Sequence, residues 1–568
     1  VEQIVRLLVG VVLGPNRNAL VVEVQHLARH RAAPDTEHCS STRQVVQRCE
    51  VFSKAHRVPL RHDVEHCSEA QGRGLRCDPG RDQQPIRNDL VALVLKVMLC
   101  CPERVEAEPL GFFGGIDVLE GRFPARFIRV AAVHRIGQAG AGVVHFDSSE
   151  EKRTEFEIFC SHHSVYVRTM ASTLLQRATT VHADVTHQQQ DIRIIDGVIT
   201  AIGDLTAEPA DDVVDLRGHV LMPAAVEPHA HLDKAFLAEQ IENSTGDLMG
   251  AIVAMRSNRH LLDVNETVER AERAARLMAA NGFRAVRSHA DTTLEHGLTS
   301  IEALVEVKRR VADVIDVEIV ALSGWPVMGP GGADQRALLH DALRAGADLV
   351  GGCPHLEGGD TLGPTEFFLQ TATDHGVGVD LHTDETLDPA ATGLAELAEM
   401  VAAGFDQPVT ASHCVSLSMQ SERDQQATSE AVAAAGIGVV ALPHTNLFLQ
   451  GRGRSPMPRG LTAVAVLRAA GAQVAAGADN LQDPFNPVGR ACPFETAGLM
   501  IMTSHLLPHD AWSLVSTIAG RVTSFGAQTL AVGERADLVA VRAATLREAI
   551  AFGPAERIVW RNGQRLAA

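Results

Sequence analysis

The sequence lacks an excess of positive charge and lacks a long apolar run. Its 568 residues carry a formal net charge of −19, which opposes unaided binding to phosphate backbones and anionic membranes because both attract basic surfaces. No stretch reaches the roughly 18 apolar residues of a membrane span, and the opening run Ile4–Leu13 has neither that length nor a small-residue cleavage site. We therefore expect a soluble, cytoplasmic protein with no nucleic-acid partner and no membrane partner.

Composition divides the chain into two parts. Seven of the ten cysteines and the single tyrosine lie before Met170. Residues 1–169 carry 22 Lys and Arg against 21 Asp and Glu, whereas the remaining residues carry 29 against 49. Apolar runs in the first part are isolated and follow no persistent helix or strand period. We expect residues 1–169 to be an over-extended start or a poorly ordered, irregular arm.

The first part also lacks a strong zinc motif. Its Glu-His-Cys-Ser tetrapeptide occurs twice, at Glu37–Ser40 and Glu65–Ser68, but neither copy has the tight Cys-x-x-Cys spacing of such sites. We expect no zinc site in this part.

Over the whole chain Arg outnumbers Lys 46 to 5, as a GC-rich coding sequence would produce. This composition fits an over-extended start at residues 1–169.

From Met170 the pattern becomes regular and predicts strands. In residues 170–222, Asp191–Ile199 predicts a hairpin with Asp196-Gly197 at its turn. Asp212–Leu221 predicts two more short strands. We interpret this segment as the first part of a small β-sandwich.

Residues 223–520 alternate strands with amphipathic helices. Glu266–Ala280 is the clearest helix, with Asn265 as its expected N-cap and Gly282 suited to a left-handed C-terminal position. Eight strand-helix repeats over roughly 300 residues match a (β/α)8 barrel. The predicted strands end near His229, His289, Leu322, Gly351, His382, His413, Leu442 and Asp479, and further helices are predicted at Ala391–Ala403, Gln426–Ala435 and Leu461–Ala470.

A doubly wound open sheet is the alternative fold, but the chain lacks its G-x-G-x-x-G loop after the first strand. Beyond the barrel, residues 521–568 contain Gly533–Val541 and Arg557–Gly563, which return to strand spacing. We therefore expect an α/β protein: a TIM-type barrel flanked by two segments that together form one β-sandwich.

Candidate metal ligands stand at the predicted strand ends. His229 and His231 are two residues apart, so on an extended segment both imidazoles point to one face, as two ligands of one metal must. The carboxyl ends of barrel strands converge on one site. In such a barrel the side chains at the predicted strand ends would lie close together. These are His229, His231, His289, His382, His413 and Asp479.

These residues and the segments around them resemble the cytosine deaminase-like branch of the amidohydrolase superfamily. The resemblance covers about residues 170–568. It is carried, in order along the chain, by Glu227–Lys234 (EPHAHLDK), His382–Glu385 (HTDE), Thr410–His413 (TASH), Val440–Arg452 (VALPHTNLFLQGR) and Gly477–Val488 (GADNLQDPFNPV).

The resemblance implies one divalent metal, zinc or iron, held by His229, His231, His382 and Asp479. The fourth-strand segment Gly352–Glu357 (GCPHLE) offers no lysine, so we expect no carbamylated-lysine dinuclear site. A divalent ion with an open position can lower the pKa of a bound water from 15.7 to about 7, which supplies hydroxide at neutral pH.

Two further residues have catalytic roles in this interpretation, together with Asp479. Glu385 resembles the family's proton shuttle, which protonates the ring nitrogen and then the leaving amine. His413 is not needed to complete the ligand set, and we assign it to orienting the nucleophile or stabilising the tetrahedral adduct.

The substrate pocket departs from cytosine deaminases. Those enzymes place a glutamine after the third strand, and its approximate position here is Gly324. Losing that amide should change the substrate, while flat rings can still stack on aromatic side chains. The residues that we expect to bind substrate are Lys234, Trp325, His289, Asn446 and Phe485.

We expect a metal-dependent deaminase for a small amino-substituted heterocycle, releasing ammonia or an amine. Cytosine, isocytosine, creatinine-like rings and aminotriazines remain open as substrates. A cyclic amidase or N-acyl hydrolase on the same barrel is the alternative, and a non-catalytic scaffold is a second. The zinc nucleoside deaminases are excluded because no P-C-x-x-C follows His355-Leu-Glu357. We also expect a homo-oligomer.

Overall fold

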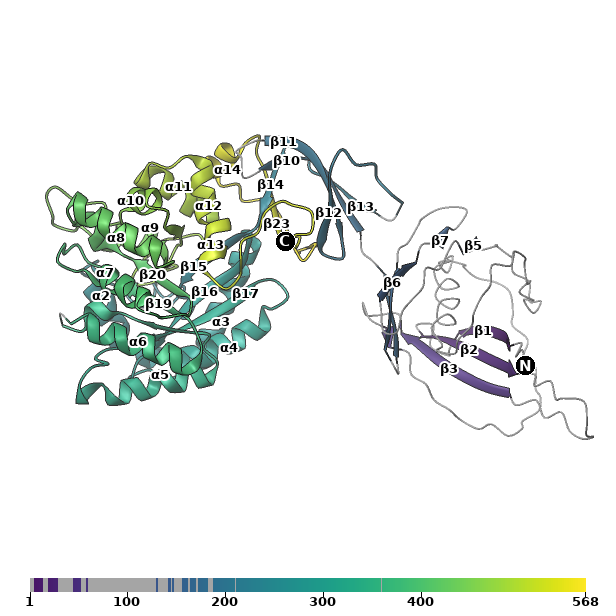
Figure 1. Cartoon of the computed structure of the whole chain (residues 1–568), viewed down its shortest axis with the longest axis horizontal. Helices are drawn as coiled ribbons and strands as arrows, with labels where there is room; N and C mark the ends of the chain where they lie inside the picture. The colour runs from purple at the N-terminus through teal and green to yellow at the C-terminus, as the bar shows by residue number, and fades with distance from the viewer. Residues whose placement is uncertain are drawn as a thin grey trace, which may run out of the picture. The chain divides into compact units, whose positions relative to one another are not determined.

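The computed structural model describes residues 172–567 apart from 182–186, 210 and 359, together with nine short strands within residues 5–169 (Figure 1). The chain divides into two compact units, and the second consists of Thr173–Leu205 and Val213–Ala568. The two Glu-His-Cys-Ser segments lie outside the described residues. No helix in the described part is long and apolar enough to span a membrane.

Strands in the first unit form separate small sheets. The largest strands, β1 (Val5–Leu13), β2 (Ala19–Ala28) and β3 (Gln44–Phe52), pair antiparallel in that order. These strands were not predicted, because no period persists from one to the next; what they share is a high content of valine, which favours strands. The remaining part of the expected irregular arm lies outside the described residues. The shorter strands are β4 (Val58–Pro59), β5 (Arg129–Val130), β6 (Ala141–Val144), β7 (Phe146–Asp147), β8 (Phe156–Ser161) and β9 (Ser164–Thr169).

The second unit contains the predicted barrel. Eight strands pair in sequence order, each parallel to the next. A parallel bridge between Ala230 and Asp479 joins the last strand to the first and closes the ring. The fold class is therefore a (β/α)8 barrel, as predicted. Its strands are β15 (Ala225–Ala230), β16 (Phe283–Thr292), β17 (Asp316–Ser323), β18 (Leu349–Gly352), β19 (Val379–Thr383), β20 (Val409–His413), β21 (Gly438–Ala441) and β22 (Gln473–Ala476).

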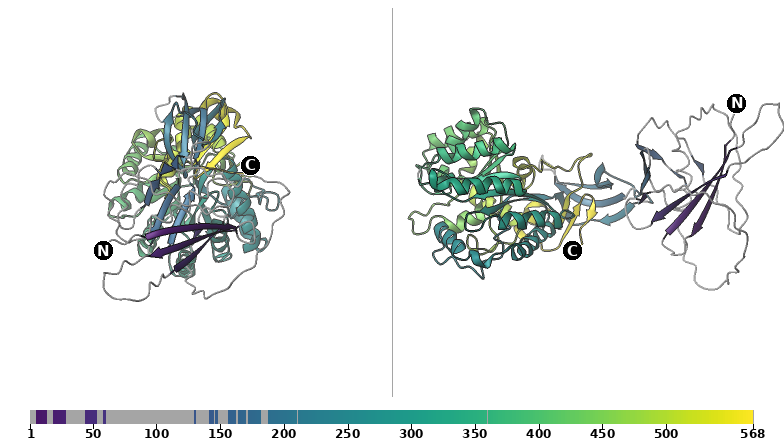
Figure 2. Two further views of the ribbon diagram at one scale, coloured as in Figure 1. Left: turned by 90° about the vertical axis from the view of Figure 1, so that its right-hand side faces the viewer. Right: turned by 90° about the horizontal axis from the view of Figure 1, so that it is seen from below.

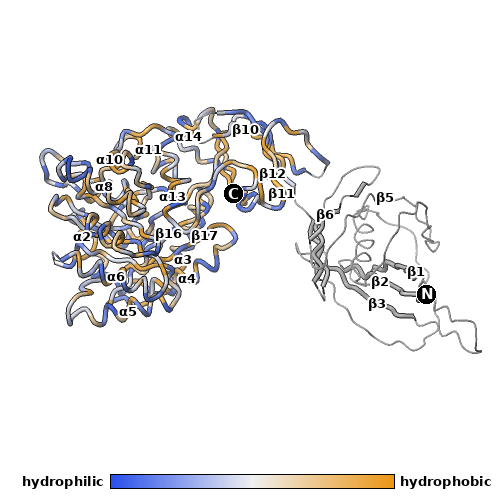
Figure 3. Tube along the Cα trace, viewed as in Figure 1, coloured by the Kyte–Doolittle hydropathy of each residue, from blue (hydrophilic) through white to orange (hydrophobic). Residues whose placement is uncertain are grey.

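Helices surround these strands (Figures 1 and 2) and mix hydrophilic with hydrophobic residues along their length (Figure 3). This is the pattern of elements with one face on the barrel and one in solvent. The helices are α2 (Leu248–Ser257), α3 (Val264–Ala280), α4 (Thr299–Arg310), α5 (Ala333–Ala345), α6 (Leu362–His375), α7 (Gly393–Ala402), α8 (Glu422–Ala434), α9 (Pro443–Leu449), α10 (Val464–Ala469), α11 (Pro493–Ser504), α12 (Pro508–Leu514), α13 (Thr517–Val522) and α14 (Leu546–Phe552).

The start of α3 differs from the prediction. Asp263, not Asn265, is the N-cap, and its carboxylate accepts a hydrogen bond from the Glu266 amide at 3.0 Å. Both residue types cap helices well. The helix is therefore present where it was predicted, but it begins at Val264, two residues before the predicted Glu266. At the other end, Gly282 has a φ of +93°, in the left-handed region as expected.

The segments flanking the barrel form one eight-stranded sheet with its own core. The predicted hairpin is present: Asp196 and Gly197, both with positive φ, connect two antiparallel strands. Met222 and Val539 also pack into the barrel's core, so this sheet is anchored to the barrel. The strands are β10 (Ser172–Val181), β11 (His187–Ile195), β12 (Val198–Gly203), β13 (Asp211–Asp215), β14 (His219–Pro223), β23 (Leu538–Arg542), β24 (Arg557–Arg561) and β25 (Gln564–Arg565).

We propose that the domain boundaries follow the prediction, with segments 170–222 and 521–568, which form one sheet where a sandwich was expected, around a barrel at 223–520. A variant that begins at Met170 should fold and bind metal like the full chain, because the barrel and its flanking sheet share the second unit. Thermal unfolding and elemental analysis check this. A melting temperature lowered by more than about 5 °C, or a loss of metal, would show that residues 1–169 stabilise the barrel.

Candidate functional site

The carboxyl ends of three barrel strands bring the four predicted metal ligands together. His229 and His231 stand at the end of β15, His382 in β19, and Asp479 just after β22. The Asp479 Oδ1 lies 3.1 Å from His231 Nε2 and 3.4 Å from His229 Nε2. His382 Nε2 lies 3.3 Å from His231 Nε2. All four side chains are buried.

The donor set fits a divalent cation. His229 Nε2 and Asp479 Oδ1 are buried, and neither atom forms a hydrogen bond with any described residue. One ligand atom each from His229, His231 and His382 lies within 4.8 Å of the others, and the same holds for His229, His413 and Asp479. Three imidazoles and one carboxylate are common zinc and iron ligands. These four residues are the ones that would hold the metal.

The protonation states suit metal binding. Burial lowers the pKa of His229 to about 4 and the pKa of His382 well below its usual value. Although burial acts to raise the pKa of Asp479, the neighbouring His229 and His231 hold it well below the ordinary range. Near neutral pH the imidazoles of His229 and His382 are therefore uncharged and the Asp479 carboxylate is ionised, which are the forms that bind a metal.

A chain of buried hydrogen bonds orients His229. Its Nδ1 lies 2.8 Å from Ser412 Oγ, and that hydroxyl donates to Asp380 Oδ1 at 2.8 Å. Because the single hydroxyl proton goes to Asp380, the serine oxygen accepts from His229 Nδ1–H. The tautomer is thereby fixed, and the lone pair on His229 Nε2 faces the cluster. Arg287 completes the chain by donating to Asp380 at 2.8 Å and to Glu318 at 2.6 Å.

Removing the Ser412 hydroxyl should weaken metal binding. In Ser412→Ala, His229 loses the acceptor that fixes its tautomer, and we expect metal affinity to fall about 10- to 100-fold. Competition with a chromogenic chelator measures the change. Ser416→Ala is the matched control, since its buried hydroxyl donates to Ala391 O at 2.8 Å and contacts no ligand. Equal metal affinity in the two variants would remove Ser412 from this role.

Glu227 fixes the position of Asp479. Its buried carboxylate accepts from the Ala478 amide at 3.0 Å and from the His229 amide at 3.3 Å. Burial raises the pKa of Glu227 to about 8. A Cβ at Gly477 would lie 2.4 Å from Glu227 Oε1, so this position requires glycine. Glu227 lies in the predicted motif Glu227–Lys234, but its role was not predicted.

Glu385 and His413 lie beside the cluster. Asn446 Nδ2 is 3.3 Å from Glu385 Oε1 and 3.1 Å from His413 Nδ1, so the amide links the two side chains. His413 Nε2 is 3.9 Å from Asp479 Oδ2 and has no hydrogen-bond partner among the described residues. Burial and the nearby Asp479 raise the pKa of Glu385 well above its ordinary value, against the effect of Asn446. A carboxyl in this state can donate as well as accept a proton.

Strained backbone conformations cluster at this site. Asp384, His413, Cys414 and Asp479 all have φ between +49° and +71°, in the left-handed region that non-glycine residues avoid. The Asp384 carboxylate accepts from the amides of Gly393 and Leu394 at the start of α7, which holds the loop that carries Glu385. Such strain persists only where the surroundings enforce it.

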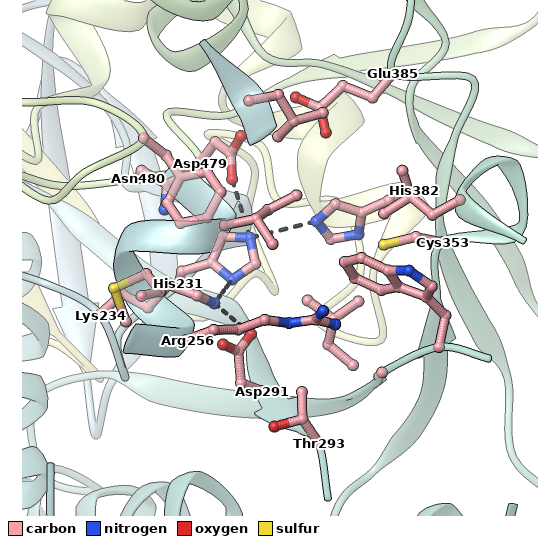
Figure 4. A pocket seen from close by; sticks show the side chains of 18 of the residues that line it. His231, Lys234, Arg256, Asp291, Thr293, Cys353, His382, Glu385, Asp479 and Asn480 are labelled. Atoms are coloured by element: carbon pink, nitrogen blue, oxygen red, sulfur yellow. Dashed lines mark hydrogen bonds and ion pairs between the residues drawn. The ribbon is translucent and has the colours of Figure 1, made fainter. Parts of the chain in front are cut away.

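A pocket opens in front of the cluster (Figure 4). Of the predicted substrate-binding residues, Lys234, Trp325 and Phe485 line it, together with the proposed catalytic groups. His289 and Asn446 are not part of its wall. His289 lies instead within the histidine cluster, fully buried and stacked on His229 with ring centroids 3.9 Å apart.

Lys234 takes part in an ion network at the pocket wall. Its Nζ lies 2.6 Å from Asp291 and 2.9 Å from His231 Nδ1. Arg259 forms a short ion pair with the same Asp291. Asp291, Arg259 and the nearby Arg256 were not predicted, because they lie outside the motifs that carry the family resemblance.

Gly324, the approximate position of the glutamine of cytosine deaminases, is closely surrounded. A Cβ there would lie 3.0 Å from Gln335 Oε1 and 3.2 Å from the Thr293 methyl group, so a larger residue would require these two side chains to shift by a few tenths of an ångström.

Comparison with known proteins gives concordant matches. The model of the amidohydrolase family matches residues 238–567. Pterin deaminase of Rhizobium rhizogenes is 35% identical over 390 residues, which cover 66% of this chain and 87% of that protein. The structure of 5-methylcytosine deaminase from Klebsiella pneumoniae is 28% identical, with a TM-score of 0.63 over 70% of this chain and 97% of its own. N-isopropylammelide isopropylaminohydrolase from Burkholderia multivorans is 29% identical, with a TM-score of 0.61 over 70% and 98%.

Proposed function

The chain belongs to the amidohydrolase family, whose members are metal-dependent hydrolases of carbon–nitrogen bonds, and we propose that it hydrolytically deaminates an amino-substituted heterocycle. The observation that carries the proposal is the position of Glu385. It is a buried carboxyl of raised pKa beside a metal-binding set, and it lies at the wall of a pocket large enough to accept a ring.

The proposed ligands are His229, His231, His382 and Asp479, which would hold zinc or iron. A divalent ion in this position acidifies water and polarises the atom under attack. The chain's own contribution is to fix the tautomer of His229 through Ser412 and Asp380, and to hold Asp479 through Glu227.

Glu385 moves the protons in this proposal. Its carboxylate would accept the first proton of the attacking water and pass it to the ring nitrogen beside the amino carbon. It would then accept the second water proton, from the hydroxyl group of the tetrahedral adduct, and pass it to the leaving amine as the carbon–nitrogen bond breaks. His413 Nε2, which faces Asp479, hydrogen-bonds the oxygen that adds to the ring. Asn446 contacts both side chains and fixes their positions relative to each other.

Substrate recognition rests on the pocket wall. Trp325 and Phe485 offer aromatic faces for a flat ring, and Lys234 offers a charged donor. Although burial acts to lower it, the carboxylates Asp233 and Asp291 raise the pKa of Lys234, so the ammonium stays charged. Pterin contains an isocytosine edge, and the similarity to pterin deaminase favours rings of that kind over cytosine.

An ammonia-release screen tests the proposal. The metal-loaded chain is offered isocytosine, pterin, cytosine and aminotriazines at equal concentration. We expect release from at least one ring with an isocytosine edge. Ring opening without ammonia or amine would instead support the alternative, a cyclic amidase on the same scaffold, and no hydrolysis of any ring would reject both.

A further inference from the structure

One face of α2 forms a wall of the pocket. Leu248, Ile252, Met255 and Arg256 line it, at a spacing that places them on one side of the helix. The helix start is fixed, because the Asp247 side chain accepts from the Gly250 amide at 2.7 Å. Three of the four residues are apolar, and the fourth brings a cation into the pocket.

Arg256 has no anionic partner. Its guanidinium lies over the Trp325 ring, 4.2 Å from the centroid, and forms no hydrogen bond or ion pair with any described residue. Arg259, one turn further, differs because Asp291 neutralises it. The cation–π contact orients the Arg256 group but does not satisfy its N–H donors.

The carboxylates of the pocket are engaged elsewhere. Asp291 pairs with Lys234 and Arg259. Asp479 belongs to the metal-binding set, and Glu385 contacts Asn446. No carboxylate of the pocket lining is therefore left to pair with Arg256, which is half-buried and open to an anion carried by a ligand.

We propose that Arg256 and Trp325 form a subsite for a carboxylate carried by the heterocyclic substrate. This inference rests on the proposed function and narrows its substrate class to amino-heterocycles with a ring carboxylate. A guanidinium binds a carboxylate through two parallel hydrogen bonds. A carboxylate attached to an aromatic ring lies in the plane of that ring, which suits a pocket with aromatic walls.

The geometry also sets where the carboxylate is attached. In Figure 4, Arg256 and Glu385 lie on opposite sides of the pair His231 and His382. In the proposed reaction Glu385 transfers protons beside the carbon that carries the amino group. We therefore expect the substrate's carboxylate on the part of the ring system remote from the leaving amine.

The test compares rings that differ in this group alone: pterin, its 6-carboxylate and its 6-carboxamide. Calorimetry measures binding to the metal-loaded full chain carrying Glu385→Gln, which slows turnover, and kcat/KM is measured without that substitution. We expect the carboxylate to bind at least about tenfold more tightly than either neutral ring. Arg256→Gln should abolish this preference, so that the ratio of the affinities for the carboxylate and the neutral rings falls to about one.

Arg273→Gln is the matched control, because Arg273 stacks on Phe236 at 4.1 Å outside the pocket. It should keep the preference. Equal affinity for the three rings, or a preference that survives Arg256→Gln, overturns the subsite while leaving deamination open. A carboxylate that binds through Arg256 keeps the subsite even if it releases no ammonia, and the proposed reaction is then overturned if no other ring of the ammonia-release screen is deaminated. Failure of all three rings to bind overturns the subsite, and the ammonia-release screen then decides the proposed reaction by itself.

Discussion

Glu385→Gln is expected to keep its metal and to lose about 10²-fold or more in kcat, the usual scale for a general acid–base residue. The amide preserves the size of the side chain but cannot carry a proton between the water, the ring and the leaving amine. Metal content by elemental analysis and steady-state kinetics on the best substrate of the ammonia screen provide the two readouts.

Asn446→Ala helps to interpret that result. Asn446 contacts both Glu385 and His413 but moves no proton in this account. Its loss should reduce kcat less than the loss of the Glu385 carboxyl. Activity of Glu385→Gln within about threefold of the unsubstituted chain would exclude Glu385 from the proton transfers, since general acid–base groups contribute far more than that.

Asp479→Ala is expected to lose most of its metal and, with it, all measurable turnover. The carboxylate supplies the only negative charge in a set that otherwise consists of imidazoles, and a three-ligand remnant binds a divalent ion much more weakly. His229→Ala should behave in the same way. Elemental analysis should find about one divalent ion per unsubstituted chain.

A nearby aspartate provides the control for metal loss. Asp483 is also fully buried, and its carboxylate accepts from Asn480 at 2.7 Å and from the Phe485 amide at 2.8 Å. Asp483→Asn changes the same loop without touching the proposed ligand set and should retain the metal. Unchanged metal content in both Asp479→Ala and His229→Ala would reject the ligand assignment.

The strand ends were predictable because apolar residues repeat differently along the sequence in barrel strands and in helices. Each predicted strand end lies within three residues of an observed one; for example, β20 ends at His413 itself. A barrel brings such ends together, so the sequence could predict that His229, His382 and Asp479 become neighbours. That these residues bind metal remains a prediction, which the experiments above test.

The supporting contacts were not predictable from the pattern. Ser412 meets His229 across 183 positions of sequence, and no local period indicates which side chain will accept from which ring nitrogen. Arg256 lies on a helix whose apolar residues gave no sign of facing a pocket rather than the core. The order of β13 and β14, which both pair with β10, also follows from tertiary packing.

The most direct test of the central claim is the identity of the product formed by the metal-loaded chain from an isocytosine-type ring such as pterin. Mass spectrometry and ammonia quantitation are made on one sample, before and after the metal is removed and restored. The account predicts one ammonia for each product molecule, oxygen in place of the amino group, and loss of both signals without metal. A ring opened by water with no ammonia, or equal turnover without metal, would contradict it.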